Sequence, residues 1–457
     1  MKEVELNEVD PEKQPMTGVG QAAGEKNGSV KLKLPDDEVT FTGLSKEELM
    51  KVAGTPGWVR ARWVLLILFW LGWVGMLAGA IVIIVKAPPC KPIPEMNWWN
   101  EGPLYQISDL EAFSDGLEGN LDNMNQLKVK GLIIGPLHTV QEDKPSTLSL
   151  KVLDPALGTE AALKSLVEKA HKKGISVILD LTPNYNGTSS WFSHGNEADE
   201  GAEYWLNLGI DGIKVSDVTV PAESADWSKL QAAVKGNRTA DSNTKNKCVL
   251  LMGVAKGISA PEVSQLANTS GIDLLLSDLL SPQKGEQLTK QATAPGLGRL
   301  YQLLLFTMPG TPVFTYGDEI GLSAEVLMLP REPAEGSVNE TAVRKERMET
   351  RKWFKTLSDL RGKERSLLHG DFYKLHGSAA VLSYLRLWDQ SERYVTVVNF
   401  GSAAETVSLK PQGVDLPEQA KVKLSTDAEL KPDTMVDLDK IQLQPVQGVL
   451  LQFPYVA

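Results

Sequence analysis

One uninterrupted apolar segment, residues 63–85, constrains this chain more than any other feature. The segment contains no charged residue and follows a long, largely polar stretch. At roughly 1.5 Å per residue, a helix of this length extends about 34 Å, enough to cross a hydrocarbon core of about 30 Å. A cleaved signal peptide has a far shorter charged region before its apolar part. The sequence therefore predicts a single transmembrane helix that acts as a signal-anchor.

The charges that flank this segment predict its orientation. The nearby basic residues are Lys46, Lys51, Arg60 and Arg62 before it and Lys86 and Lys91 after it. This excess before the segment predicts a cytosolic N-terminus and an extracellular C-terminus, a type II topology. The Asn-x-Ser/Thr acceptors for N-glycosylation that follow the segment are Asn186, Asn237, Asn268 and Asn339. Because Asn27 in the N-terminal part has the same tripeptide, these acceptors support the orientation without deciding it.

Residues 1–62 form the predicted cytosolic tail. Most of the tail is rich in Glu, Lys, Gly and Pro and poor in large apolar residues, a composition that predicts disorder. One short helix is expected near residues 46–53, because Ser45 and Glu48 have the spacing of a capping box.

The transmembrane segment itself indicates two contacts. Membrane lipid is expected around it, and Gly75 and Gly79 form a Gly-x-x-x-Gly face that predicts close packing against a neighbouring helix. The glycine motif is weak by itself, because glycine is common in membrane spans.

Charge and histidine spacing limit the other partners. The net charge of −11, without a basic stripe interleaved with aromatic residues, argues against nucleic acid. His138, His171 and His194 lack the spacing of metal ligands, so we expect surface or capping roles for them. Neither a metal nor a cofactor is expected.

The two cysteines have different surroundings. Cys90 lies just after the apolar segment, in a proline-rich juxtamembrane linker of residues 86–103. In an oxidising compartment, an exposed unpaired cysteine tends to form an intermolecular disulfide. Cys248 begins an apolar run that predicts a buried strand, where cysteine behaves as a small hydrophobic residue. An intermolecular bond at Cys90, a Cys90–Cys248 bond, and a free or lipidated Cys90 all remain open.

Beyond the linker, short apolar runs alternate with helical patterns, which predicts a parallel α/β architecture closed as a (β/α)₈ barrel over residues 104–365. The expected strands are 104–107, 129–134, 175–181, 212–218, 248–254, 273–277 and 312–316. Residues 281–298 offer no apolar run for a seventh barrel strand, so the barrel is expected to be irregular there. Over residues 366–457 the apolar period becomes two, which predicts an antiparallel β-sandwich.

Several stretches resemble the α-amylase family of glycoside hydrolases. They are Leu-Asp-Pro-Ala-Leu-Gly-Thr at 153–159, Ala-His-Lys-Lys-Gly at 170–174, Val-Ile-Leu-Asp-Leu-Thr-Pro-Asn at 177–184, and the segments 309–314 and 316–321. The resemblance implies a catalytic barrel followed by a β-sandwich, in agreement with the periodicity.

The same resemblance implies that the catalytic residues are missing. Retaining glycosidases need two carboxylates about 5 Å apart. The position of the family's nucleophile is Ser216 here, that of its general acid is Val254, and that of a sugar-binding histidine is Tyr185. No histidine between 194 and 369 can supply the family's seventh-strand motif. Asp217 could replace the nucleophile, but strand alternation turns it away from the Ser216 side.

A second resemblance, to the heavy-chain subunits of heteromeric amino-acid transporters, accounts for the span, the cysteine and the degraded barrel together. The matching segments are 46–49, 53–60, 69–73 and 365–372. This resemblance implies a heavy chain that does not itself transport. It implies a disulfide from Cys90 to a polytopic light chain, which the heavy chain brings to the plasma membrane and stabilises, and contacts with other cell-surface proteins.

Two other kinds of protein compete with this interpretation. A membrane-anchored α-glycosidase requires carboxylates that the matched positions lack. A carbohydrate-binding or adhesion receptor has no need of a cysteine beside the membrane, although a disulfide-linked homodimer would also use Cys90.

Overall fold

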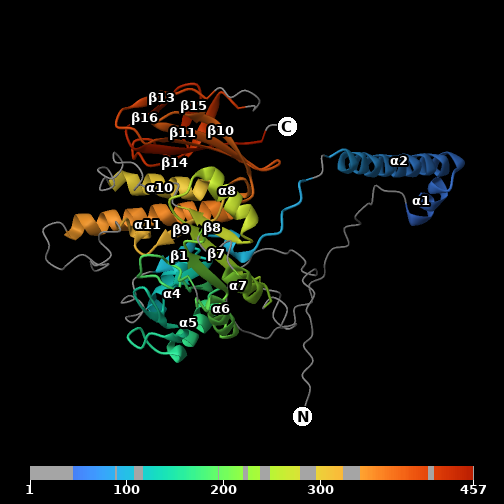
Figure 1. The fold of residues 1–457 in the computed structure, drawn as a ribbon. Helices are drawn as coiled ribbons and strands as arrows, with labels where there is room; N and C mark the ends of the chain where they lie inside the picture. The colour runs from blue at the N-terminus through green and yellow to red at the C-terminus, as the bar shows by residue number, and fades with distance from the viewer. Residues whose placement is uncertain are drawn as a thin grey trace, which may run out of the picture. The chain divides into compact units, whose positions relative to one another are not determined.

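The computed structural model describes residues 45–87, 90–107, 117–193, 195–219, 225–236, 248–277, 295–322, 340–409 and 416–455. The chain divides into two compact units, Met1–Pro89 and Cys90–Ala457. Figure 1 shows the elements of each unit.

The first unit contains two helices in its described part. Helix α1 (Lys46–Ala53) begins at the predicted capping box, in which Ser45 and Glu48 each bond the other's backbone. Helix α2 (Pro56–Lys86) begins with proline in its first turn, where the missing N–H costs nothing. It extends about 46 Å and contains the predicted span. Within the described residues, it is the one helix long and apolar enough to cross a membrane.

The second unit begins with a parallel seven-stranded sheet, ordered β8-β7-β6-β5-β2-β1-β9. Its strands are β1 (Leu104–Ile107), β2 (Gly131–Ile134), β5 (Ser176–Asp180), β6 (Gly212–Ser216), β7 (Leu250–Ala255), β8 (Leu274–Ser277) and β9 (Val313–Thr315). All seven coincide with predicted strands. β8 and β9 form the two edges of this sheet. In a complete eight-stranded barrel, one more strand, the seventh in chain order, would lie between them. The predicted irregularity at 281–298 falls mainly in residues 278–294, outside the described part.

Helices follow the barrel strands along the chain. They are α4 (Leu117–Gln126), α5 (Glu160–Lys172), α6 (Ala198–Asn207), α7 (Ala225–Gly236), α8 (Ala260–Thr269), α10 (Pro295–Thr307), α11 (Glu340–Lys363) and α12 (Arg365–Leu368), with the 3₁₀ turns η1 (Trp98–Asn100) and η4 (Asp318–Ile320). In α5, Leu163, Leu166 and Ala170 are buried at helical spacing. The hairpin of β3 (His138–Gln141) and β4 (Lys144–Leu153) was not predicted.

The N-terminal end of the barrel is closed by η1. Trp99 is buried with Leu104 and Leu250 from the strands. Trp98 packs against this cluster, and its indole nitrogen donates to the backbone oxygen of Cys248 at 2.9 Å. A Cβ at Gly131 would lie 2.9 Å from the Trp98 ring, so glycine leaves room for the tryptophan.

The chain ends in two antiparallel sheets. The larger has the order β10-β11-β12-β17-β14-β15 and the smaller pairs β13 with β16. Their strands are β10 (Asp371–Gly377), β11 (Val381–Leu387), β12 (Arg393–Asn399), β13 (Glu405–Val407), β14 (Gln419–Ser425), β15 (Met435–Asp437), β16 (Ile441–Leu443) and β17 (Gln447–Phe453). Side chains of both sheets, such as Val395 and Ile441, share one buried cluster, which makes this the predicted β-sandwich.

Two arginines, one from the barrel and one from the sandwich, bind the C-terminal end of α10, a helix that lies between the barrel strands and the sandwich in Figure 1. Arg361 donates to the Phe306 carbonyl at 2.7 Å, and Arg386 from β11 donates to the Thr307 carbonyl at 2.7 Å. The carbonyls at a helix C-terminus carry partial negative charge and favour cations. Burial lowers the pKa of both guanidinium groups to about 10, which leaves them charged at neutral pH.

Candidate functional site

The carboxyl ends of β5, β6 and β7 carry the positions that the amylase resemblance singles out. Ile178 and Met252 belong to the buried cluster of Trp99 at the N-terminal end of the barrel, so both side chains face the barrel interior. Because alternate residues of a barrel strand share a side, Asp180, Ser216 and Val254 face the interior as well. Ser216 and Val254 are register partners on adjacent strands, so the structure brings these two predicted positions side by side.

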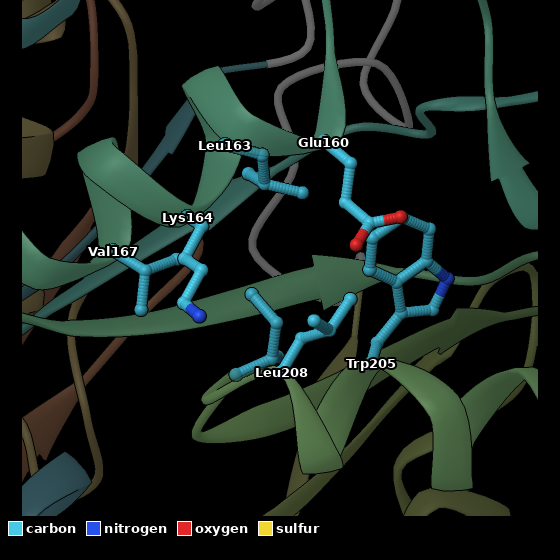
Figure 2. Close-up of a pocket in the computed structure, with 7 residues that line it drawn as sticks. Glu160, Leu163, Lys164, Val167, Trp205 and Leu208 are labelled. Carbon is cyan, nitrogen blue, oxygen red and sulfur yellow. The ribbon is translucent and has the colours of Figure 1, made fainter.

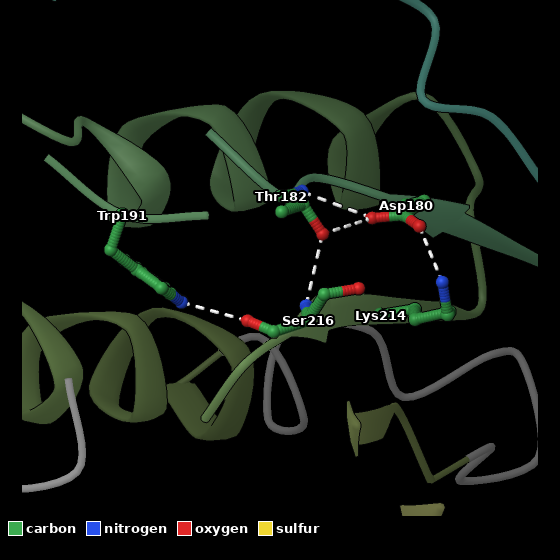
Figure 3. A network of polar contacts seen from close by, with 5 residues as sticks. All are labelled: Asp180, Thr182, Trp191, Lys214 and Ser216. Carbon is green, nitrogen blue, oxygen red and sulfur yellow. Dashed lines mark hydrogen bonds and ion pairs between the residues drawn. The ribbon is translucent and has the colours of Figure 1, made fainter. Parts of the chain in front are cut away.

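A polar network fixes the backbone around Ser216 (Figure 3). Lys214 Nζ lies 2.5 Å from Asp180 Oδ2, and the other oxygen of Asp180 accepts bonds from the Thr182 amide at 3.0 Å and hydroxyl at 2.6 Å. The Thr182 hydroxyl in turn accepts from the Ser216 amide at 2.9 Å. On the other side, Trp191 Nε1 donates to the Ser216 carbonyl at 2.8 Å. Most polar groups of this network therefore already form hydrogen bonds or an ion pair with another member of the network.

This network occupies Asp180, a carboxylate of the barrel wall. Among the interior positions of the seven described strands, Asp180 alone is acidic, and its ion pair with Lys214 leaves both side chains 6% exposed. Asp217 lies just after β6 in a left-handed conformation, with φ of 54°, and accepts from Thr219 Oγ1 at 3.1 Å. The strand alternation expected there does not extend to it, because β6 ends at Ser216.

Tyr185 belongs to a second cluster beside β3. Its hydroxyl donates to the His138 carbonyl at 3.1 Å, and the two rings meet edge to face at 5.2 Å. His138 Nε2 lies 3.3 Å from the Pro183 carbonyl. Burial lowers the pKa of His138 and raises that of Tyr185. His171 pairs with Asp211 at 2.7 Å, and His194 lies outside the described residues.

Two surface depressions lie elsewhere. One, of about 10 Å³, is lined by Glu160, Leu163, Lys164, Val167, Trp205, Leu208 and Ile210 between α5 and α6 (Figure 2). It has room for about one water molecule. The other, of about 320 Å³, lies between α11 and the loop after β14 and includes Trp353 and Asp427. Neither includes Ser216 or Val254.

Both cysteines are exposed free thiols in the structure. For Cys248 this corrects the prediction of a buried strand residue. The strand β7 begins two residues later, at Leu250, and Cys248 precedes it at the end of the barrel where Trp98 binds its carbonyl. The apolar run was real, but its first residue lies outside the sheet.

The remaining predicted sites are accessible where the structure describes them. Gly75 and Gly79 lie one turn apart on α2, and a Cβ added to either would meet no atom within 4 Å. Asn186 follows β5 and Asn268 lies on α8, and both side chains are exposed. Asn237 and Asn339 lie outside the described residues.

Comparisons with known proteins match two parts of the chain. Residues 29–105 match the family model "Solute carrier family 3 member 2 N-terminus", and residues 108–231 match "Alpha amylase, catalytic domain". The mouse protein "Amino acid transporter heavy chain SLC3A2" is 43% identical over 100% of this chain and 98% of its own length. This chain belongs to the SLC3A2 family of amino acid transporter heavy chains. The mouse SLC3A1 heavy chain is 22% identical over 90% of the chain.

Solved structures support the amylase-like fold of this family member. A trehalose-6-phosphate hydrolase of Bacillus licheniformis has a TM-score of 0.57 at 14% identity, covering 78% of this chain and 100% of the hydrolase. An α-amylase of Geobacillus thermoleovorans has a TM-score of 0.54 at 16% identity, covering 78% of this chain and 99% of the amylase. At these identities the likeness concerns the fold.

Sequence reasoning missed two interactions. The pairing of Asp180 with Lys214 joins neighbouring strands, and both residues lie in strands predicted from the sequence, so a strand alignment could have placed them together. The second joins Lys91 of the linker to the sandwich, through Asp389 and Asp371. No local pattern links residues so distant in sequence.

Proposed function

We propose that this chain is the non-catalytic heavy chain of a heteromeric amino-acid transporter. It is linked by a disulfide at Cys90 to a polytopic light chain that carries the amino acid. It is required for the delivery of that light chain to the plasma membrane and for its stability there. The observation that carries the proposal is 43% sequence identity, over the full length of this chain, to a mouse protein named as an amino acid transporter heavy chain.

The barrel interior supports a role without catalysis. Glycoside hydrolysis requires a nucleophile and an acid, supplied in most families by two carboxyl groups. Ser216 and Val254 stand at the matched positions, and the nearby Asp180 is neutralised by Lys214. Neither Ser216 nor Val254 can replace a carboxylate in this chemistry.

The membrane segment supports an accessory role in transport. One helix cannot enclose a permeation path, and residues 63–85 contain no ionisable side chain to mark one. The open face at Gly75 and Gly79 would instead pack against a helix of the light chain.

The proposed topology places the N-terminus in the cytosol and the sandwich outside the cell. The parts are a tail of 1–62, a span of 63–85, a linker of 86–103, a barrel of 104–365 and a sandwich of 366–457. The excess of basic residues before the span supports this orientation. Exposure of Asn186 and Asn268 agrees with their use as glycosylation sites.

The decisive experiment compares Cys90→Ser with Cys248→Ser on non-reducing gels of membranes, with mass spectrometry of the shifted band. We expect a reducible band with a polytopic partner that Cys90→Ser abolishes and Cys248→Ser preserves. Partly intact non-covalent assembly is expected in Cys90→Ser, because a disulfide mainly raises effective concentration once partners are docked. A band that survives Cys90→Ser would refute the assignment. A band of this chain alone would indicate a homodimer instead.

A further inference from the structure

The residue after Cys90 is held on the β-sandwich by contacts of both its backbone and its side chain. The Lys91 amide donates to Asp389 Oδ2 at 3.1 Å. Its ammonium group lies 3.6 Å from Asp371 Oδ2 and 4.4 Å from the centre of the Trp388 ring. One linker residue thereby meets three residues of the sandwich.

These three residues form one receptor site for Lys91. Asp371 is the first residue of β10, while Trp388 and Asp389 begin the turn between β11 and β12. Asp371 pairs with Leu387 across the β10–β11 ladder, which places the start of β10 beside this turn. Trp388 is 5% exposed and packs against His369, so the ring that receives the ammonium group is itself fixed.

The contacts restrict the backbone as well as the charge. A lysine side chain alone is a flexible tether, and an exposed ion pair contributes little. Here the hydrogen bond from the Lys91 backbone amide to Asp389 fixes the peptide unit between Cys90 and Lys91. The Cα of Cys90 therefore lies about 3.8 Å from the anchored Cα of Lys91. Pro92 follows at once and confines Lys91 to an extended conformation.

We propose that Lys91 is a positioning residue that docks the linker on the sandwich. It thereby fixes the Cys90 thiol beside the first residues of β10. The inference rests on the proposed function, in which Cys90 forms the disulfide with the light chain. The cysteine-bearing extracellular loop of the light chain then approaches the side of the sandwich formed by the start of β10 and the β11–β12 turn.

The test measures the anchor directly in the full-length chain. With Cys248→Ser in the background, spin labels are placed on Cys90 and on Ser402→Cys. Ser402 is exposed just beyond β12, at the end of that strand remote from Trp388. Seven strand residues separate the two sites by about 23 Å, a distance suited to dipolar spectroscopy. We expect one narrow distance distribution.

Lys91→Gln should broaden this distribution about twofold, because the proline-rich linker, a semi-rigid spacer, then loses the ion pair that helps to hold it on the sandwich. Asp371→Asn, which leaves the sequence around Cys90 intact, should broaden it in the same direction. Lys86→Gln, which removes a lysine on the other side of Cys90, should leave it unchanged. If the distance distributions of Lys91→Gln and the parent chain have equal widths, whether both are narrow or both are broad, Lys91 does not anchor the linker.

The disulfide provides a second readout that separates this inference from the proposed function. In cells that form the reducible band, Lys91→Gln should slow its appearance about threefold or more, because the effective concentration of the thiol falls. An unchanged rate would refute positioning. If the parent chain forms no band with a light chain, the proposed function fails, while the spin-label distances still decide whether Lys91 anchors the linker.

Discussion

Lys214 Nζ lies 2.5 Å from Asp180 Oδ2 inside the barrel, and the two side chains are each 6% exposed. Removing two charges from water is costly, and a buried pair offsets this cost only with good geometry and further hydrogen bonds. Thr182 supplies those bonds to the remaining oxygen of Asp180. The pair is therefore buried and bound on both carboxylate oxygens of Asp180.

Breaking this pair should destabilise the fold. We expect Lys214→Met to lower the free energy of unfolding by about 3–5 kcal/mol, because Asp180 is left as an unpaired buried charge. The double variant Lys214→Met with Asp180→Leu should recover most of the loss. Denaturant titration of the detergent-solubilised chain measures both. A single variant within about 1 kcal/mol of the parent would contradict the role assigned to the pair.

Replacing the two matched residues should not create a glycosidase. Ser216→Asp with Val254→Glu places carboxylates on adjacent register partners, but the seventh-strand motif implied by the α-amylase resemblance is still missing, and Lys214 is already bound to Asp180. Catalytic groups that act as a unit are strongly non-additive. We expect hydrolysis of an aryl α-glucoside to stay at background. Turnover by the parent chain, lost on changing an ectodomain carboxylate, would instead reveal an active enzyme.

Glycine at the closed end of the barrel should be irreplaceable. A Cβ at Gly131 would lie 2.7 Å from Leu104 and 2.9 Å from Trp98. We expect Gly131→Ala to cost about 1–3 kcal/mol of unfolding free energy, as overpacked cores do. Gly362 on α11 is the matched control, since a Cβ there meets nothing within 4 Å. Gly362→Ala should be neutral or stabilising, and equal effects of both changes would contradict the packing argument.

The barrel was predictable because its strands are buried apolar runs, such as Gly131–Ile134, whose signal is local. The strand β10 was missed because nearly all of its residues are exposed, and β4 because its register is irregular. Likewise, the neighbouring positions of Ser216 and Val254 followed from motifs on consecutive barrel strands. The anchor at Lys91 could not be predicted, because it depends on how a linker folds back onto a distant turn.

Stability should fall in mild acid through His138. Burial lowers the pKa of this histidine in the folded state below its unfolded value of about 6.5, so the unfolded chain binds more protons below that pH. The contribution of His138 is therefore absent above about pH 6.5 and increasingly destabilising below it. His138→Gln should reduce the slope of unfolding free energy against pH between about 6.5 and 5. An unchanged slope would show that other groups dominate.

The roles of the two ends of the chain can be separated by truncation. A chain ending after Trp99 keeps Cys90 and the apolar helix α2 but loses the barrel, the sandwich and the receptor site for Lys91. We therefore expect its disulfide with the light chain still to form, though more slowly, while detergent stability and surface delivery of the complex decrease. Deletion of residues 1–40 should alter neither much, because it leaves the helix, the thiol and the ectodomain intact. Surface biotinylation of the light chain and amino-acid uptake measure both truncations. Full delivery and stability with the first truncation would assign assembly to the membrane helix alone.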